Sequence, residues 1–321
     1  MEDISFLNTL KMKYNYSDKL ITALDKIIPK LIVFYGHEYE AIIKKAISTT
    51  RIIECTPMQP ISSILPVLKL TKQNKEKSLI KENIKTSPSI YIADPVIIYD
   101  ELLNSYIIKD VKRYIILAHF HNLDSPRGLA TLTHELSKLI RSYQNEFKIS
   151  NDILMEKTGL KISLKKIIKE QDIISLNLQK EQNVGLETGI NSYEEEQITS
   201  LVINDKYETF DTKIPKKVAF ILYERLGLKQ DIIKQSLTGT NEFEERYNIK
   251  PDLLKGLSEL VDEAVKQEEQ NSDINITKEE KNQIEEELNK INRQIGDNII
   301  FYINANRIIN DERKYKNKEN I

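Results

Sequence analysis

Residues 128–143 read GLATLTHELSKLIRSY, and this stretch decides how the middle of the chain is interpreted. Leucine, isoleucine and tyrosine recur in it every three or four residues, which is the spacing of an amphipathic helix. Ser125 is placed to cap the N-terminus, and Pro126 occupies the first helical position, where proline is favoured. The sequence therefore predicts a capped helix from residue 126 to about residue 145.

The polar side of this helix carries the residues of chemical interest. Thr131, His134, Lys138 and Arg141 lie opposite the apolar stripe, with Glu135 on the flank. We therefore expect this side to border a cleft or bulk water. A solvated helix face is the simplest explanation of such a set.

The same stretch resembles the His-Glu-x-x-His helix of gluzincin-type zinc metallopeptidases, in which two histidines one helical turn apart share a zinc ion. The strand-like run KRYIILAHF (112–120) precedes it, and GLETGINSYEEE (185–196) resembles the helix that carries the third ligand. The resemblance covers roughly residues 110–205. It implies a zincin-like core, a mixed sheet packed on the active-site helix, with His134 as first zinc ligand and Glu135 as general base.

Two positions depart from that pattern. Lys138 stands where the second histidine belongs, and Thr188 stands where the family has its ligand glutamate, with Glu187 one position earlier. An ammonium has no lone pair to donate and repels a nearby divalent cation. We therefore expect a degenerate metallopeptidase without zinc, cofactor or catalysis, in which Lys138 neutralises Glu135 or Glu187 and a peptide or protein still binds in the cleft.

Two alternatives stay open. The first is an active zinc hydrolase that binds zinc through His134, Glu187 and either His119 or His121, with Glu135 as the base. The second is a non-enzymatic helical interaction protein that uses its C-terminal helices.

Composition restricts the protein class. The 321 residues carry a net charge of −2, so no overall charge favours nucleic acid or an anionic membrane. Cys55 is the only cysteine, which leaves no internal disulfide and fits a reducing compartment. The N-terminus has no apolar run of the secretory kind, and we expect a soluble, cytoplasmic protein.

The remaining patterns predict an α+β protein. Strands are expected at 31–36, 51–56, 89–99 with a break at Pro95, and 112–120; hairpins at 146–184 turning at Gly159; and helices at 185–205 and beyond 212. The lysine-rich segment 71–89 and the acidic run Glu194–Glu196 are expected to be solvated. Three regions are predicted: an N-terminal α/β region (1–110), the zincin-like core (111–211) and a helical C-terminal domain (212–321). Thr277 and Glu280 form a capping box that opens the final helix.

Overall fold

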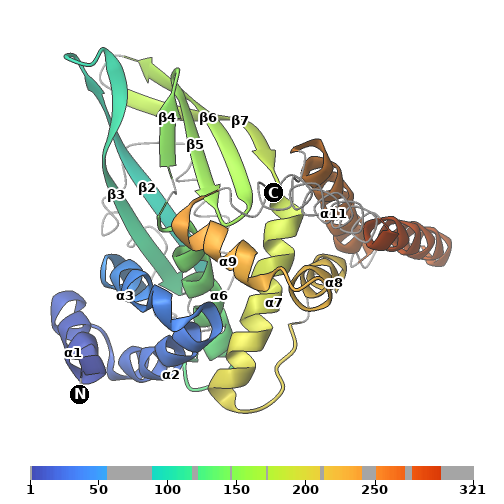
Figure 1. Cartoon of the computed structure of the whole chain (residues 1–321), viewed down its shortest axis with the longest axis horizontal. Helices are drawn as coiled ribbons and strands as arrows, with labels where there is room; N and C mark the ends of the chain where they lie inside the picture. The colour runs from blue at the N-terminus through green and yellow to red at the C-terminus, as the bar shows by residue number, and fades with distance from the viewer. Residues whose placement is uncertain are drawn as a thin grey trace, which may run out of the picture. The chain divides into compact units, whose positions relative to one another are not determined.

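The computed structural model describes residues 2–55, 89–117, 122–144, 147–170, 173–209, 213–240, 251–271 and 277–297. Within these residues the protein mixes helices with two small sheets (Figure 1). They divide into two compact units. The first has the bounds Met1–Gly159, Ser163–Lys180 and Glu194–Thr209, and the second has the bounds Leu160–Ile162, Glu181–Tyr193 and Phe210–Ile321. The domain boundary predicted after residue 110 falls inside a strand of the first unit, and that predicted after residue 211 falls outside the described residues.

A three-stranded sheet forms the centre of the first unit. Its strands are β1 (Thr50–Glu54), β2 (Ser89–Asp100) and β3 (Ser105–Leu117). They lie in the order β1-β3-β2; β1 is parallel to β3, and β2 is antiparallel to it. Among the described residues, β2 is therefore an edge strand.

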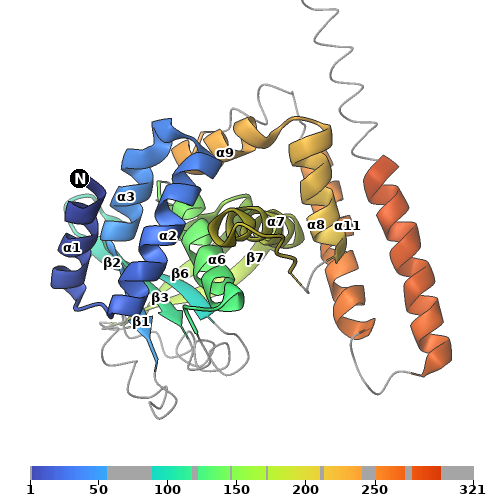
Figure 2. The ribbon, with the colours of Figure 1, turned by 90° about the horizontal axis from the view of Figure 1, so that it is seen from below.

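Helices precede and follow this sheet along the chain. They are α1 (Glu2–Tyr14), α2 (Asp18–Tyr35), the short η1 (His37–Tyr39), α3 (Glu40–Ser48) and α6 (Pro126–Ser142). Helix α3 contacts β1, helix α6 contacts β2, and both α2 and α3 contact α6 (Figure 2). Helix α6 is thus enclosed by the sheet on one side and by other helices on another.

The strand predicted at 31–36 is wrong, because these residues form the last turns of α2. Buried residues recur through this helix at helical spacing, including Leu24, Ile28, Leu31 and Tyr35. The apolar run 31–36 continues that stripe past Pro29 instead of starting a strand. A short apolar run fits either structure, and only the preceding residues distinguish them.

The strand break predicted at Pro95 is also wrong, since β2 runs through it with only a shift in register between Val96 and Ile97. A proline lacks the N–H that a central strand would need, but an edge strand tolerates it. The other predicted strands, at 51–56 and 112–120, correspond to β1 and to the second half of β3 as far as they are described, since residues 56 and 118–120 lie outside the described residues.

A second sheet has the order β4-β5-β6-β7. Its strands are β4 (Phe147–Ser150), β5 (Ile153–Thr158), β6 (Lys161–Glu170) and β7 (Ile173–Gln182), with Gly159 at positive φ between β5 and β6, as the sequence predicts. Ile97 of β2 packs with Leu154 and Ile167 of this sheet. The far half of the β2–β3 ribbon is therefore part of a second, smaller core.

Helix α7 (Val184–Ile203) follows β7, with its first half in the second unit and its second half in the first. The later elements of the second unit are all helical among the described residues: α8 (Lys213–Phe220), the π-helical turn η2 (Ile221–Arg225), α9 (Lys229–Thr238), α11 (Pro251–Asn271) and a helix over 278–297. The predicted capping box is confirmed, because Thr277 N–H donates to Glu280 and Glu280 N–H donates to the Thr277 hydroxyl. The lysine-rich segment 71–89, which the sequence predicts to be solvated, lies outside the described residues except for Ser89.

The start of α6 depends on a glycine. Ser125 accepts a hydrogen bond from Gly128 N–H at 3.1 Å, which confirms the predicted cap. A Cβ added at Gly128 would lie 1.8 Å from the carbonyl oxygen of Asn122. Only glycine lets the loop before α6 pass this close to the first turn.

We predict that Gly128→Ala lowers the melting temperature, because the added methyl forces the Asn122 backbone to move, at a cost of about 1–3 kcal/mol. The matched control is Gly256→Ala in α11, where an added Cβ meets nothing within 4 Å. That change should be neutral or stabilise the protein by about 0.5–1 kcal/mol, as alanine does in a helix interior. Calorimetric unfolding of both variants tests this, and equal shifts would contradict the close approach.

Candidate functional site

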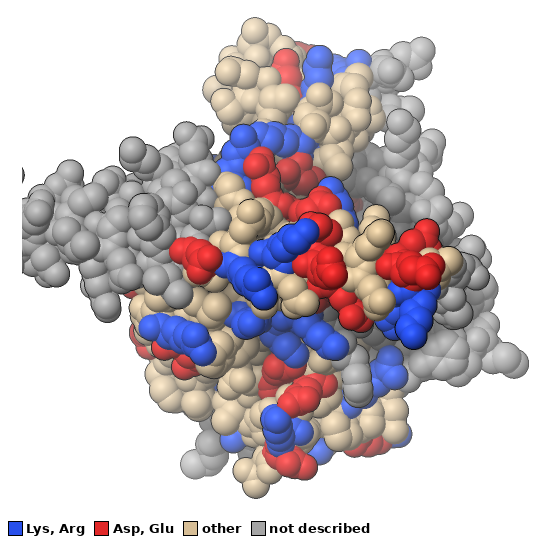
Figure 3. Space-filling model, turned by 90° about the vertical axis from the view of Figure 1, so that its right-hand side faces the viewer, with Lys and Arg blue, Asp and Glu red and all other residues tan. Residues whose placement is uncertain are grey.

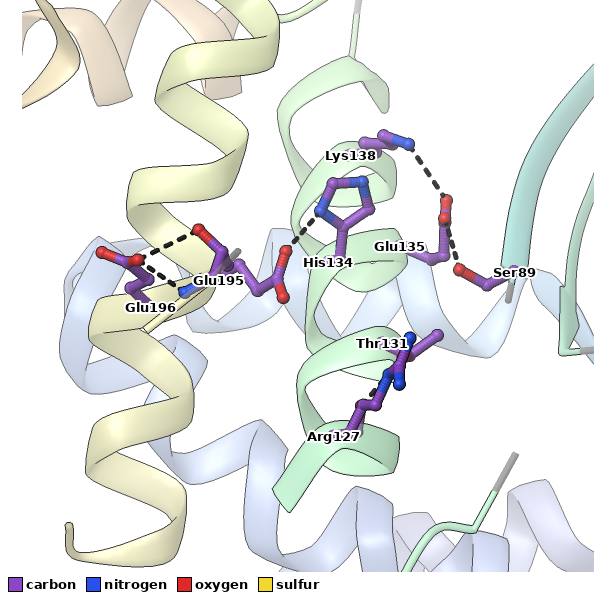
Figure 4. A network of polar contacts seen from close by, with 9 residues as sticks. Ser89, Arg127, Thr131, His134, Glu135, Lys138, Glu195 and Glu196 are labelled. Carbon is purple, nitrogen blue, oxygen red and sulfur yellow. Dashed lines mark hydrogen bonds and ion pairs between the residues drawn. The ribbon is translucent and has the colours of Figure 1, made fainter. Parts of the chain in front are cut away.

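Helix α6 places His134, Glu135 and Lys138 next to one another in the first unit (Figure 4). The expectation that this side of α6 borders a cleft or bulk water is wrong for most of its residues. Thr131, Glu135 and Arg141 are buried, whereas His134 and Lys138 are partly exposed. The polar side is therefore covered by protein, with two side chains that still reach solvent.

The Glu135 carboxylate is 2% exposed and is held from two sides. Ser89, the first residue of β2, donates its hydroxyl to Oε1 at 2.7 Å, and Lys138 Nζ lies 3.6 Å from Oε2. Of the two partners predicted for Lys138, Glu135 and Glu187, the structure pairs it with Glu135. A buried carboxylate is stable only with such a partner, since ionisation in a poorly solvated site is otherwise very costly.

Opposing effects act on the pKa of Glu135. Burial alone would raise it, but the Lys138 ammonium, His134 and the hydrogen bond from Ser89 outweigh burial and lower the pKa below its ordinary value. Glu135 is therefore ionised at neutral pH. A carboxylate with a lowered pKa is a weak proton acceptor, which does not suit it to act as a general base in this state.

His134 faces helix α7, where its Nδ1 lies 2.8 Å from Glu195 Oε2 (Figure 4). The tautomer with the proton on Nδ1 is the one that donates to this carboxylate oxygen. A carboxylate on one ring nitrogen is also the arrangement that fixes the tautomer of histidines that bind metals through the other nitrogen. Glu195 thus orients the imidazole, a role that the sequence did not indicate.

The neighbouring Glu194 is buried completely and joins three helices. It accepts a hydrogen bond from the Tyr35 hydroxyl of α2 at 2.7 Å, and Arg141 Nε of α6 lies 3.8 Å from the same oxygen. Burial, with the Glu194 charge next to it, raises the pKa of Tyr35 well above its ordinary value, so the phenol stays a donor. The guanidinium and carboxylate form a buried ion pair with 0% exposure on both side chains.

Glu196 completes the acidic run by binding the segment that follows α7. Its Oε1 accepts from Thr209 N–H at 2.6 Å and from the Thr209 hydroxyl at 3.0 Å. The prediction that Glu194–Glu196 is a solvated run is therefore wrong. Consecutive helical residues point about 100° apart, so each carboxylate of the run reaches a different neighbour.

Glu187 and Thr188 lie in the half of α7 that belongs to the second unit. Glu187 accepts a hydrogen bond from Leu160 N–H at 2.7 Å, and the Thr188 hydroxyl donates to the carbonyl of Val184 one turn earlier. The first contact ties α7 to the residue that directly precedes β6, and the second is a bond within the helix. The carboxylate that does meet His134 is Glu195, eight residues after Glu187 on the same helix.

The remaining candidate ligands, His119 and His121, lie outside the described residues. Where the structure is described, it contains no group of three or more His, Cys, Asp or Glu side chains that could hold a metal ion. In the same parts of the chain, no helix is long and apolar enough to cross a membrane. Lys and Arg side chains alternate with Asp and Glu side chains on the face shown in Figure 3, as expected for a net charge near zero.

Comparisons of the chain with protein-family models, with curated proteins and with solved structures found no significant match.

We predict that protonating Glu135 destabilises the protein. The pKa of this group is lower in the folded chain than its ordinary value of 4.5, so its contribution to stability is complete above that pH and is lost as the pH falls below it. Denaturant unfolding between pH 3 and pH 6 measures this. The wild type should lose stability more steeply with falling pH than Glu135→Gln, and identical slopes would contradict the lowered pKa.

Proposed function

We propose that this chain is a non-catalytic relative of zinc metallopeptidases that uses the inherited scaffold to bind a peptide or protein. The observation that carries the proposal is the ion pair of Lys138 with the buried Glu135, on the helix that also carries His134. Lys138 occupies the position one turn after His134, where the resemblance places the second metal ligand. The Lys138 ammonium places a positive charge beside Glu135, as a bound metal ion would.

The arrangement of the sheet supports the binding role. Strand β2 lies next to α6, as the contact from Ser89 to Glu135 shows, and within the described residues it pairs with β3 alone. An extended peptide adds readily to such an edge through main-chain hydrogen bonds. The ligand we propose is therefore an extended segment that lies along the first half of β2.

Metal analysis of the purified chain tests the loss of zinc. We predict less than stoichiometric zinc and no peptidase activity on a protein substrate with zinc added, since Lys138 repels a divalent cation. Stoichiometric zinc that a chelator removes together with peptidase activity would overturn the proposal.

A gain of function tests the resemblance itself. Lys138→His should raise zinc affinity by about tenfold or more over wild type, because it adds a second imidazole one helical turn from His134. The matched control is Lys138→Gln, which removes the ammonium without adding a strong ligand. If a folded Lys138→His binds zinc no better than Lys138→Gln, α6 does not have the geometry of a zinc-binding helix.

A further inference from the structure

The turn between β2 and β3 exposes two leucines. Leu102 is 97% exposed and Leu103 is 65% exposed. The turn lies at the end of the β2–β3 ribbon that is farthest from α6 (Figure 1). The small core that Ile97 forms with the second sheet lies nearby along the ribbon, but neither leucine belongs to it. Ile98 and Tyr99, close to the end of β2, are also exposed, each by 37%. Grouped exposed apolar residues mark interaction sites more often than a single one does.

The turn that carries them is well ordered by its own contacts. Asp100 Oδ1 accepts hydrogen bonds from Leu102 N–H at 2.9 Å and from Leu103 N–H at 3.1 Å. Asn104 follows in the left-handed conformation, at φ 47°, and accepts a hydrogen bond from the Tyr99 hydroxyl. The backbone of both leucines is thus fixed by side chains on either side of them.

Aromatic and cation–π contacts also hold the base of the turn. Tyr99 packs edge-on against Tyr106 across the ribbon, with ring centroids 5.2 Å apart, and Lys169 of β6 lies over the Tyr99 ring. A rigid turn with exposed apolar residues loses little conformational entropy when a partner covers it. The entropy cost of covering this turn is therefore small.

We propose that this turn inserts Leu102 and Leu103 into an apolar pocket with a basic rim on a partner protein. Charge complementarity identifies the rim, because Asp100 and Glu101 directly precede the leucines, whereas the neighbouring cation, Lys169, lies over the Tyr99 ring at the base of the turn. Glu101 is exposed and sits beside Leu102. A Lys or Arg on the partner would meet these carboxylates as the leucines enter the pocket.

The same charges disfavour a lipid bilayer as the occupant. Insertion of Leu102 would carry Glu101 and the fixed carboxylate of Asp100 to the headgroups, and anionic lipids would repel both. A protein pocket provides apolar walls and a cationic rim together. The proposed partner is therefore a protein, and the experiment below also tests binding to membranes.

The experiment uses the full chain with the photo-crosslinking residue benzoylphenylalanine in place of Leu103, in cells of the source organism. A crosslinked protein is identified, purified and titrated with the wild-type chain and with Leu102→Ser/Leu103→Ser. We expect the double substitution to weaken binding at least tenfold. Glu101→Lys should also weaken binding, and by a larger factor at low salt than at high salt. Leu178→Ser should leave the affinity unchanged. Leu178 is the matched control because it is an exposed leucine of β7, outside the turn.

Four results would overturn the proposal. The first is the absence of any crosslinked protein, and the second is equal affinity of the double variant and the wild type. The third is flotation of the wild-type chain, but not the double variant, with phosphatidylcholine or phosphatidylglycerol vesicles. The fourth is a concentration-dependent dimer in sedimentation velocity that the double substitution abolishes, which would make the occupant a second copy of this chain.

Discussion

The need to neutralise the buried Glu135 carboxylate governs the candidate site. This charge lies inside the first unit, and two groups stabilise it: the Ser89 hydroxyl from the edge of the sheet and the Lys138 ammonium from the next turn of α6. An uncompensated carboxylate at this depth would either stay protonated or unfold its surroundings. Lys138 meets this requirement from α6, and Ser89 meets it from the first residue of β2.

The same principle extends to the second half of α7. Glu194 is neutralised by Arg141 and also accepts the Tyr35 hydroxyl, while Glu195 accepts from His134. These contacts join α2, α6 and α7 through charges instead of through apolar packing alone. Buried ion pairs contribute little net stability, because desolvation offsets their attraction, but breaking one leaves an isolated charge. The arrangement of these helices is therefore specified by a small number of polar contacts that tolerate few single substitutions.

Local signals in the sequence predicted much of the fold. The Ser125 cap, Pro126 and the apolar spacing of α6 act within a few residues of one another, as do Thr277 and Glu280, and the structure has all of these features. The run 31–36 was misjudged because its apolar residues suit either a strand or a buried helix. These residues are helical because they continue an apolar stripe of α2 that begins further upstream, at Leu20.

The site was predictable only in part, for a related reason. The pairing of Lys138 with Glu135 follows from their spacing on one helix, and the sequence predicts it. The roles of Glu194 and Glu195 depend on Tyr35, His134 and Arg141, which are at least 53 residues away along the chain. A run of three glutamates looks the same whether solvent or other helices surround it.

A double-mutant cycle between Glu135 and Lys138 tests the central claim most directly. The free energy of unfolding at pH 7 is measured for the wild type, Glu135→Gln, Lys138→Met and the double variant. If Lys138 neutralises Glu135, Lys138→Met destabilises the wild type more than it destabilises Glu135→Gln, with a coupling of about 1 kcal/mol or more. Additive effects of the two substitutions would show that the ammonium does not stabilise the buried carboxylate, and would contradict the account.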